Sequence, residues 1–199
     1  MRRLAFSLVL AFIPVAYGGV ITFDDLPLAS GGAPIPTSYS GLNWNDWGYT
    51  SAPFGNDGYA TALTSSPNVA FNLGANSPGD FAIITSTTPF ILSSGEFAAA
   101  FDNGLTITLT AKLFGNQVGT VNFIVNETTR LLETFNFGPV TELDFSVSGG
   151  TPALGVDGAG PFFALDNLTI NAPEPATPAL VLMGSVILAF LKRRARSSI

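Results

Sequence analysis

Alternation of apolar and polar side chains recurs along this chain, and it constrains the fold more than any other feature. Between residues 104 and 113, five apolar side chains at every second position alternate with three threonines and one lysine. A period of two places one set on one face of an extended strand and the other set on the opposite face. The segment is therefore predicted to be a half-buried β-strand, and the same alternation appears at 121–125 and 143–147.

Further short apolar segments extend this pattern over most of the chain. Strands are also predicted at 20–23, 59–63, 68–71, 81–85, 96–101, 131–137 and 162–170. Turn-forming Gly, Asn and Asp separate these segments, and 21 Gly with 14 Pro argue against long helices. About ten short strands without helices predict an all-β fold, a two-sheet β-sandwich of jelly-roll type.

Composition excludes several classes of site. The chain has no Cys and no His, which excludes zinc fingers, disulfide scaffolds, thiol nucleophiles and histidine-based catalysis or metal binding. Between residues 19 and 171 there are 13 acidic and 2 basic side chains, a net charge of −11. A body this acidic has no basic patch to neutralise phosphates, so no nucleic-acid partner is expected.

The N-terminus has the features of a secretory signal peptide. Arg2 and Arg3 precede an apolar run over 4–15, and Ala16 to Gly18 supply small residues where signal peptidase cleaves. A short buried helix is the alternative, but nothing in the run is amphipathic. Residues 1–18 are therefore predicted to be removed, which leaves a single β domain over 19–171.

The C-terminal segment, 172–199, has three parts in a fixed order. Pro173, Glu174 and Pro175 come first, an apolar helix over 176–191 follows, and a basic end closes the segment with Lys192, Arg193, Arg194 and Arg196. A helix of this length is marginal for a hydrocarbon core of about 30 Å. The basic end favours the cytoplasmic side, which leaves the β domain outside.

These three parts, on a chain with a signal peptide, resemble the PEP-CTERM sorting signal of Gram-negative bacteria. The resemblance implies that an exosortase in the inner membrane recognises the Pro-Glu-Pro motif and cleaves nearby. The protein would be anchored transiently and then released or transferred to the cell surface or extracellular matrix, usually in species that produce exopolysaccharide. One departure is that the basic end continues to Ile199, and an ordinary tail anchor is the alternative.

Residues 27–58 differ from the rest of the domain, because prolines and glycines deny them a long strand. The segment nevertheless carries both tryptophans, and its aromatic residues suggest a sugar-stacking platform with asparagines that bond hydroxyls. The candidate ligand-binding residues are Tyr39, Asn43, Trp44, Asn45, Trp47 and Tyr49. The alternative is a long loop that its own aromatic side chains hold over the end of the core.

Two aspartates near the ends of the domain are candidate metal ligands. Asp25 falls in phase with Ile21 and Phe23, and Asp166 falls in phase with the apolar residues of 162–170. Buried carboxylates need compensation, and Ca²⁺ binds oxygen ligands without His or Cys. The alternative is that Asp166 accepts hydrogen bonds from backbone amides at a bulge and Asp25 caps a turn.

Two family resemblances bear on the domain itself. The segment 165–170 resembles the last strand of carbohydrate-binding jelly rolls, where the matching Asp helps to hold a structural calcium. The order of 21–26, 41–44, 68–72 and 165–170 resembles an uncharacterised group of secreted sandwich proteins that often bear the same tail.

The leading hypothesis is an exported, non-enzymatic protein of the cell surface or matrix, with exopolysaccharide as a candidate partner. A carbohydrate-binding module is the second hypothesis. A glycoside hydrolase built on paired carboxylates is less favoured, because the sequence shows no such pairing. An ice-binding surface is also less favoured, since Thr106, Thr108 and Thr110 form only one threonine row.

Overall fold

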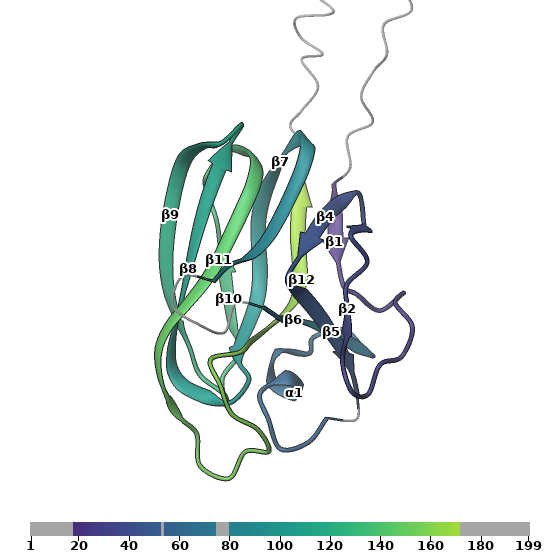
Figure 1. The fold of residues 1–199 in the computed structure, drawn as a ribbon, viewed down its shortest axis with the longest axis vertical. Coiled ribbons are helices and arrows are strands. Elements are labelled where there is room, and N and C mark those ends of the chain that lie inside the picture. Colours follow the sequence, from purple (N-terminus) through teal and green to yellow (C-terminus); the bar gives the residue numbers. More distant parts are fainter. Residues whose placement is uncertain (1–17, 53, 75–79, 172–199) are drawn as a thin grey trace, which may run out of the picture. The chain divides into compact units, whose positions relative to one another are not determined.

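Antiparallel strands make up most of the described body, together with one short helix. The computed structural model describes residues 18–52, 54–74 and 80–171 (Figure 1). The helix is α1 (Tyr59–Ala62). The strands are β1 (Gly19–Ile21), β2 (Ala33–Pro34), β3 (Ser38–Tyr39), β4 (Leu42–Asn45), β5 (Trp47–Ser51), β6 (Asn68–Asn72), β7 (Ala82–Ala99), β8 (Asp102–Leu113), β9 (Asn116–Val125), β10 (Leu131–Thr134), β11 (Pro139–Pro152) and β12 (Phe163–Asn171). The predicted all-β class is confirmed.

The strands join in one hydrogen-bonded sheet with the order β2-β5-β6-β12-β7-β11-β8-β9. Strand β7 is the longest, at 18 residues, and it has different neighbours along its length. Near Ile84 it lies between β4 and β11, whereas near Phe97 it lies between β12 and β10. Pro89, which has no N–H to donate, lies between these two parts. Separate strands were predicted at 81–85 and 96–101, and the structure joins them into one.

Inward-facing apolar side chains of the long strands form the core. In β8 the predicted alternation holds, and Leu105, Ile107, Leu109 and Ala111 are all fully buried. Strand β11 pairs with β8 in register Phe145↔Leu109, which adds its own inward side chains to the same core. Figure 1 shows β7, β8, β9 and β11 on one side of the molecule and the short strands β1, β2, β4 and β5 on the other.

The core also joins strands that are distant in the sheet order. The ring of Trp47 in β5 lies 5.2 Å from that of Phe145 in β11 and 5.7 Å from that of Phe163 in β12, both edge to face. Aromatic pairs at such distances contribute beyond the area they bury. The sheet therefore encloses its apolar face instead of leaving it to solvent.

The predicted strand at 59–63 is wrong, because Tyr59–Ala62 form α1 and Leu63 is its C-cap. Backbone N–H of Tyr59 donates to Oδ1 of Asp57 at 3.1 Å, which satisfies one of the free amides at the start of the turn. Ala62 is buried against Ala98 and Ala164. Gly58 is required at the start of α1, since a Cβ there would lie 1.8 Å from the carbonyl oxygen of Ala99.

Both ends of the described domain meet in one strand pair. Strand β1 runs antiparallel to β12 with Gly19 opposite Ile170 and Ile21 opposite Leu168. The chain therefore enters and leaves the domain at the same end of the sheet (Figure 1).

Candidate functional site

The predicted sugar-stacking residues lie in the core, which corrects the platform hypothesis. Trp44 and Trp47 are 3% and 2% exposed, and Tyr39 and Tyr49 are also buried. The Trp44 Nε1 donates to the carbonyl oxygen of Tyr39 at 3.0 Å, and the Trp44 ring lies 5.6 Å from that of Trp47. Their faces are covered by protein, so a sugar cannot stack on them.

The physical reason is a strand alternation that the Pro and Gly content of 27–58 concealed. In β4, Leu42 and Trp44 are buried whereas Asn43 and Asn45 are exposed. Strand β4 is paired on one side with β3 and on the other with β7. The two asparagines are thus accessible, but the aromatic side chains that were expected to accompany them point into the core.

Asp166 is fully buried, as its phase predicted, and protein donors surround its carboxylate. Backbone N–H groups of Thr64 and Ser65 donate to Oδ2 at 2.7 and 2.8 Å, and that of Asn167 donates to Oδ1 at 2.7 Å. The Ser65 hydroxyl adds a contact to Oδ1 at 3.1 Å. Burial raises the pKa of Asp166, and the hydrogen bonds from these donors oppose that rise.

These hydrogen bonds match the alternative that we gave for Asp166. Asn167 has a positive φ of 47°, and the β12–β7 register shifts between Asp166 and Thr169, so the carboxylate does lie at a bulge. Among the residues that the structure describes, no three acidic side chains are grouped to hold a metal ion. Calcium at Asp166 therefore remains the competing hypothesis.

Asp25 is exposed, so its predicted inward phase is wrong. Strand β1 ends at Ile21, and Phe23 has a left-handed φ of 64°, which breaks the alternation before Asp25. The Asp25 Oδ1 accepts a hydrogen bond from the Tyr39 hydroxyl at 2.5 Å. Burial and this acidic neighbour raise the pKa of the Tyr39 phenol.

Several predicted residues lie outside the described ranges. Of the predicted signal peptide, the structure describes only Gly18. At the other end, it does not describe the sorting motif (Pro173, Glu174 and Pro175) or the basic end from Lys192 to Arg196. Within the described ranges, no helix has the length and apolar character needed to cross a membrane.

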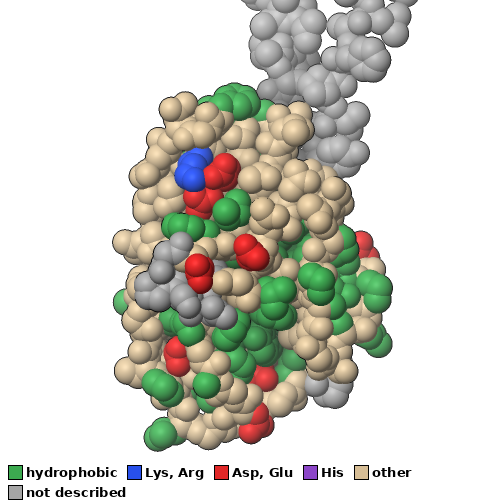
Figure 2. Space-filling model, viewed as in Figure 1, with side chains coloured by type: hydrophobic (Ala, Val, Ile, Leu, Met, Phe, Trp, Pro, Cys, Tyr) green, Lys and Arg blue, Asp and Glu red, His purple; other side chains and the backbone are tan. Residues whose placement is uncertain are grey.

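A cavity of about 260 Å³ lies elsewhere, at the end of the molecule that carries α1. Figure 1 shows α1 and the loop before β12 at this same end, the lower one as drawn. Figure 2 shows acidic side chains among hydrophobic ones over the lower part of the visible face. The cavity is lined by aromatic side chains, acidic side chains and glycine-rich backbone: Phe54, Tyr59, Phe71, Phe101, Asp57, Asp157, Thr50, Ser30, Gly31, Gly32 and Gly55. We call it the aromatic pocket.

Tyr59 stands at the centre of the aromatic wall. Its ring centroid lies 6.2 Å from that of Phe54, 5.6 Å from Phe71 and 5.7 Å from Phe101. These rings come from the loop before α1, from α1 itself, from β6 and from the β7–β8 turn, so the wall exists only in the folded chain. Burial raises the pKa of Tyr59, and its phenol is neutral at physiological pH.

Glycines allow two of these rings to lie where they do. A Cβ at Gly48 would lie 2.6 Å from Cζ of Phe71, and a Cβ at Gly158 would lie 2.2 Å from Cε1 of Phe101. Real Cβ atoms do not approach rings this closely, so both positions require glycine. The glycine content at 27–58 and at 155–160 thus has a role in shaping the pocket.

Two carboxylates converge over Gly55 at the edge of the pocket. An ideal Cβ on Gly55 would lie 3.3 Å from Oδ2 of Asp157 and 3.7 Å from Oδ2 of Asp57. Asp157 also accepts a hydrogen bond from the backbone N–H of Asn56 at 3.1 Å, which ties the two loops together. Burial raises the pKa of Asp57, and the nearby charge of Asp157 adds to the effect.

No basic side chain compensates this pair within the described ranges. The two basic side chains in the described ranges form ion pairs with other residues. Lys112 pairs with Glu142 at 2.6 Å and with Asp144, and Arg130 pairs with Glu96 at 2.8 Å. The aromatic pocket therefore combines apolar ring surface with uncompensated negative charge.

Sequence reasoning missed this site. The strand predicted at 59–63 is α1 in the structure, and the candidate ligand-binding residues of 27–58 do not include Phe54. Asp57 and Asp157 are 100 positions apart in the chain, and no local pattern signals that they converge.

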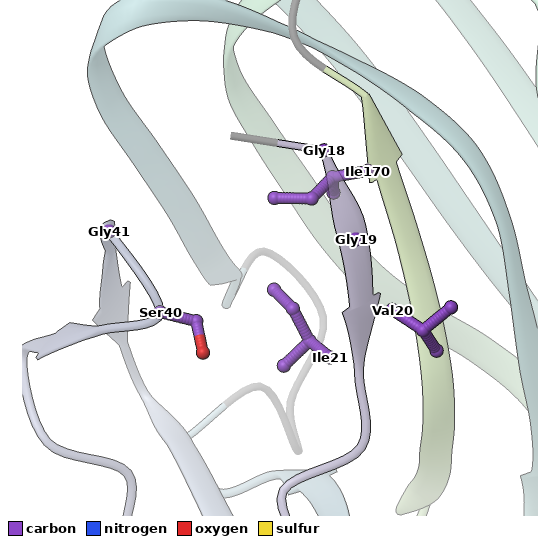
Figure 3. Close-up of a pocket in the computed structure, with 7 residues that line it drawn as sticks. All are labelled: Gly18, Gly19, Val20, Ile21, Ser40, Gly41 and Ile170. Carbon is purple, nitrogen blue, oxygen red and sulfur yellow. The ribbon is translucent and has the colours of Figure 1, made fainter. Parts of the chain in front are cut away.

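A second cavity, of about 360 Å³, lies beside the β1–β12 pair (Figure 3). It is lined by glycines and aliphatic residues with one hydroxyl: Gly18, Gly19, Gly41, Val20, Ile21, Ile170 and Ser40. Figure 3 shows the Ile21 and Ser40 side chains pointing toward each other, whereas Val20 points away. It has no charged group and little to orient a ligand.

The threonine row on β8 does not extend into an array. Thr106, Thr108 and Thr110 lie opposite Ile124, Asn122 and Thr120 on β9. On the other side, their partners in β11 are Ser148, Ser146 and Asp144. A regular threonine surface therefore does not cover the neighbouring strands.

Comparisons with known proteins give little beyond the architecture. No family model matches the chain, and no curated protein matches it. Among solved structures, a DUF4465 family protein from Bacteroides caccae is similar at 15% identity and a TM-score of 0.49, over 85% of this chain and 97% of that one. A DUF4465 family protein from Bacteroides ovatus is similar at 10% identity and a TM-score of 0.42, over 81% of this chain and 96% of that one. Similarities of this size do not indicate a shared function.

Proposed function

We propose that this protein is exported, sorted and cleaved by an exosortase, and retained at the cell surface or in the extracellular matrix as a non-enzymatic binding module. The terminal segments support the sorting route, since a signal peptide precedes the domain and a three-part tail follows it. The β1–β12 pair is consistent with this route, because both terminal segments join the domain at one end of the sheet. Cleavage of both would leave every described strand intact.

We also propose that the sheet is a two-layer sandwich of jelly-roll type. The change of neighbours along β7 supports this, since one part of the strand pairs with β4 and β11 and the other with β12 and β10. The contact between Trp47 and Phe145 supports it as well, because these rings belong to strands on different sides of β7 in the sheet order.

The bound partner in this proposal is a carbohydrate, and the aromatic pocket is the observation that carries it. The aromatic side chains of Phe54, Tyr59 and Phe101 offer apolar surface to a pyranose, and the carboxylates of Asp57 and Asp157 can accept hydrogen bonds from its hydroxyls. Sugar stacking, which the sequence predicts for Tyr39 and Trp44, is thus proposed for other aromatic residues, at the end of the domain that carries α1.

A glycoside hydrolase is the second candidate, favoured by the convergence of Asp57 and Asp157. Such enzymes use two carboxyl groups about 5 to 10 Å apart, one of them with a raised pKa. Here, however, both carboxylates accept hydrogen bonds from backbone N–H groups of residues 56 and 59, which gives each a structural role. Release of reducing sugar from a polysaccharide that the protein binds would favour the enzyme.

Retention on insoluble polysaccharide tests the binding proposal. Phe54→Ala is expected to reduce retention by about tenfold, the equivalent of losing roughly 1.4 kcal/mol of ring contact. Phe114→Ala is the matched control, because Phe114 is 68% exposed at the β8–β9 turn and does not line the pocket. Equal loss in both variants, or retention by neither variant nor the parent, would contradict a carbohydrate site here.

A further inference from the structure

We propose that the aromatic pocket selects a glycan unit that bears a protonated amine, as in a polysaccharide of de-N-acetylated amino sugars. This inference rests on the proposed carbohydrate function and names the class of sugar that the same site takes. It follows from the charge around the pocket, the position of its carboxylates and the nature of its walls.

Charge excludes one class of glycan first. The domain carries 13 acidic and 2 basic side chains, a net charge of −11, and both basic side chains are in ion pairs away from the pocket. Uronate or sulfate groups would meet repulsion from the whole domain and from Asp57 and Asp157 in particular. The charge therefore favours a neutral or cationic partner.

The position of the carboxylates favours a cation. Oδ2 of Asp57 and Oδ2 of Asp157 lie 3.7 and 3.3 Å from one point above Gly55, where glycine leaves the space of a side chain. An ammonium group has three donors and a full positive charge, so it can bond both oxygens and relieve their repulsion. A neutral acetamido group offers one N–H and no charge.

The walls favour an organic ammonium over a bare metal ion. The pocket is lined by the aromatic side chains of Phe54, Tyr59, Phe71 and Phe101, and aromatic side chains attract ammonium groups and pyranose C–H groups. Ca²⁺ requires six to eight oxygen ligands. In the described part of the chain, no three acidic side chains are placed so that they could hold a metal ion together.

Binding of glucosamine tetrasaccharide to the full chain, measured by titration calorimetry, tests the inference. We expect the de-N-acetylated tetrasaccharide to bind at least tenfold more tightly than its N-acetylated counterpart, and a galacturonate tetrasaccharide not to bind. Asp157→Asn should remove most of that preference while it keeps an acceptor for the Asn56 amide. Glu133→Gln on β10 is the matched control, since it removes one acidic charge away from the pocket.

Salt and pH provide readouts that a structural role for Asp157 would not move. The preference for the amine should shrink as NaCl rises from 50 to 500 mM, because an ion pair at the pocket edge is screened. Acidification should weaken amine binding as Asp57 is protonated. Burial and the negative charges of Asp157 and Glu127 raise the pKa of Asp57, which places this loss above the pH at which an ordinary aspartate titrates.

The outcomes separate the two proposals. Equal affinity for the amino and N-acetylated sugars would overturn the amine inference and leave the carbohydrate function standing. No binding of any sugar would overturn both. A third outcome is that calcium binds the parent, fails to bind Asp157→Asn and displaces the amino sugar. That result would show that the carboxylates form a metal site instead.

Discussion

Asp166 shows at the scale of a single residue how a buried charge is stabilised without a counter-ion. Four donors from three neighbouring residues surround its carboxylate, and all but one are backbone N–H groups. Hydrogen bonds to a charged acceptor are worth about 1.5 to 3 kcal/mol each, so a carboxylate with several of them can be retained in a core.

We expect Asp166→Asn to lower the free energy of unfolding by about 1 to 3 kcal/mol, with or without calcium. An amide nitrogen would replace one carboxylate oxygen and face an N–H group of Thr64, Ser65 or Asn167, which leaves that donor unpaired. Urea denaturation of the parent and the variant measures the loss.

Calcium is tested in the same proteins by thermal melts in EDTA and in millimolar Ca²⁺. Because the four donors already satisfy the carboxylate, we expect the two melts of the parent to superimpose. A higher Tm in calcium that is lost in Asp166→Asn would instead establish the predicted ion, since only the folded chain would bind it.

Trp44 and Trp47 are a second case at this scale, because both are buried but only one uses its N–H group. Replacement of either with Ala should cost about 3 to 5 kcal/mol of stability. The Trp44 Nε1 donates to Tyr39, whereas the Trp47 Nε1 has no hydrogen-bond partner among the described residues. We therefore expect Trp44→Phe to be the more destabilising of the two Phe variants, by about 1 kcal/mol. Chemical denaturation decides it, and an equal or reversed order would count against this account.

At the scale of elements, the pairing of β8 with β11 brings three charged side chains together. Lys112 lies directly opposite Glu142, and Asp144 is the next residue on the same face of β11. The Lys112 ammonium pairs with both carboxylates and holds the pKa of Glu142 below its usual range. Burial raises the pKa of Asp144 in spite of this neighbour.

We expect Lys112→Met to destabilise the protein at pH 7 by about 1 to 3 kcal/mol, because a buried carboxylate loses its charged partner. Without Lys112, the pKa of Asp144 in the folded protein rises further above its unfolded value. The folded state then takes up protons more readily than the unfolded state, so the deficit shrinks as the pH falls through that raised pKa and is largest above it.

Urea melts between pH 3 and pH 8 measure this dependence. Lys112→Arg, which keeps the charge, is the control and should follow the parent. A deficit in Lys112→Met that does not change with pH would show that packing of the aliphatic stem, and not charge, is what the substitution removes.

Processing belongs to the scale of the whole molecule. We expect the mature protein to lack residues 1 to about 18 and to end near Pro173 to Pro175, because both terminal segments carry recognition features. The described strands begin at Gly19 and end at Asn171, so these cuts spare all of them. Intact-mass spectrometry of protein from the native host measures both ends. A secreted species that still contains Lys192 to Arg196 would contradict exosortase cleavage.

Local periodicity allowed the sequence by itself to determine the class of the fold and the inward face of its most regular strands. Leu105, Ile107 and Leu109 are buried as their alternation predicts, because side-chain direction along a strand is a property of the backbone alone. The phase of Asp166 was correct for the same reason. It failed for Asp25, since a left-handed Phe23 interrupts the strand, and no pattern of residue types announces that turn.

Only the tertiary structure decided which aromatic residues face solvent and which acids meet. The ring of Trp44 is buried because β4 is paired with β7 and its inward face is covered by Trp47 and Phe23. Asp57 and Asp157 converge because several hydrogen bonds join two loops that are distant in the chain. The Asp157 N–H donates to the Asn56 carbonyl at 2.8 Å, and the Asn56 N–H and side-chain amide donate to the Asp157 carboxylate and to the Gly155 carbonyl. Such contacts depend on how the sheet closes and on where glycines let rings approach the backbone. Neither can be predicted from the residue pattern of a single strand.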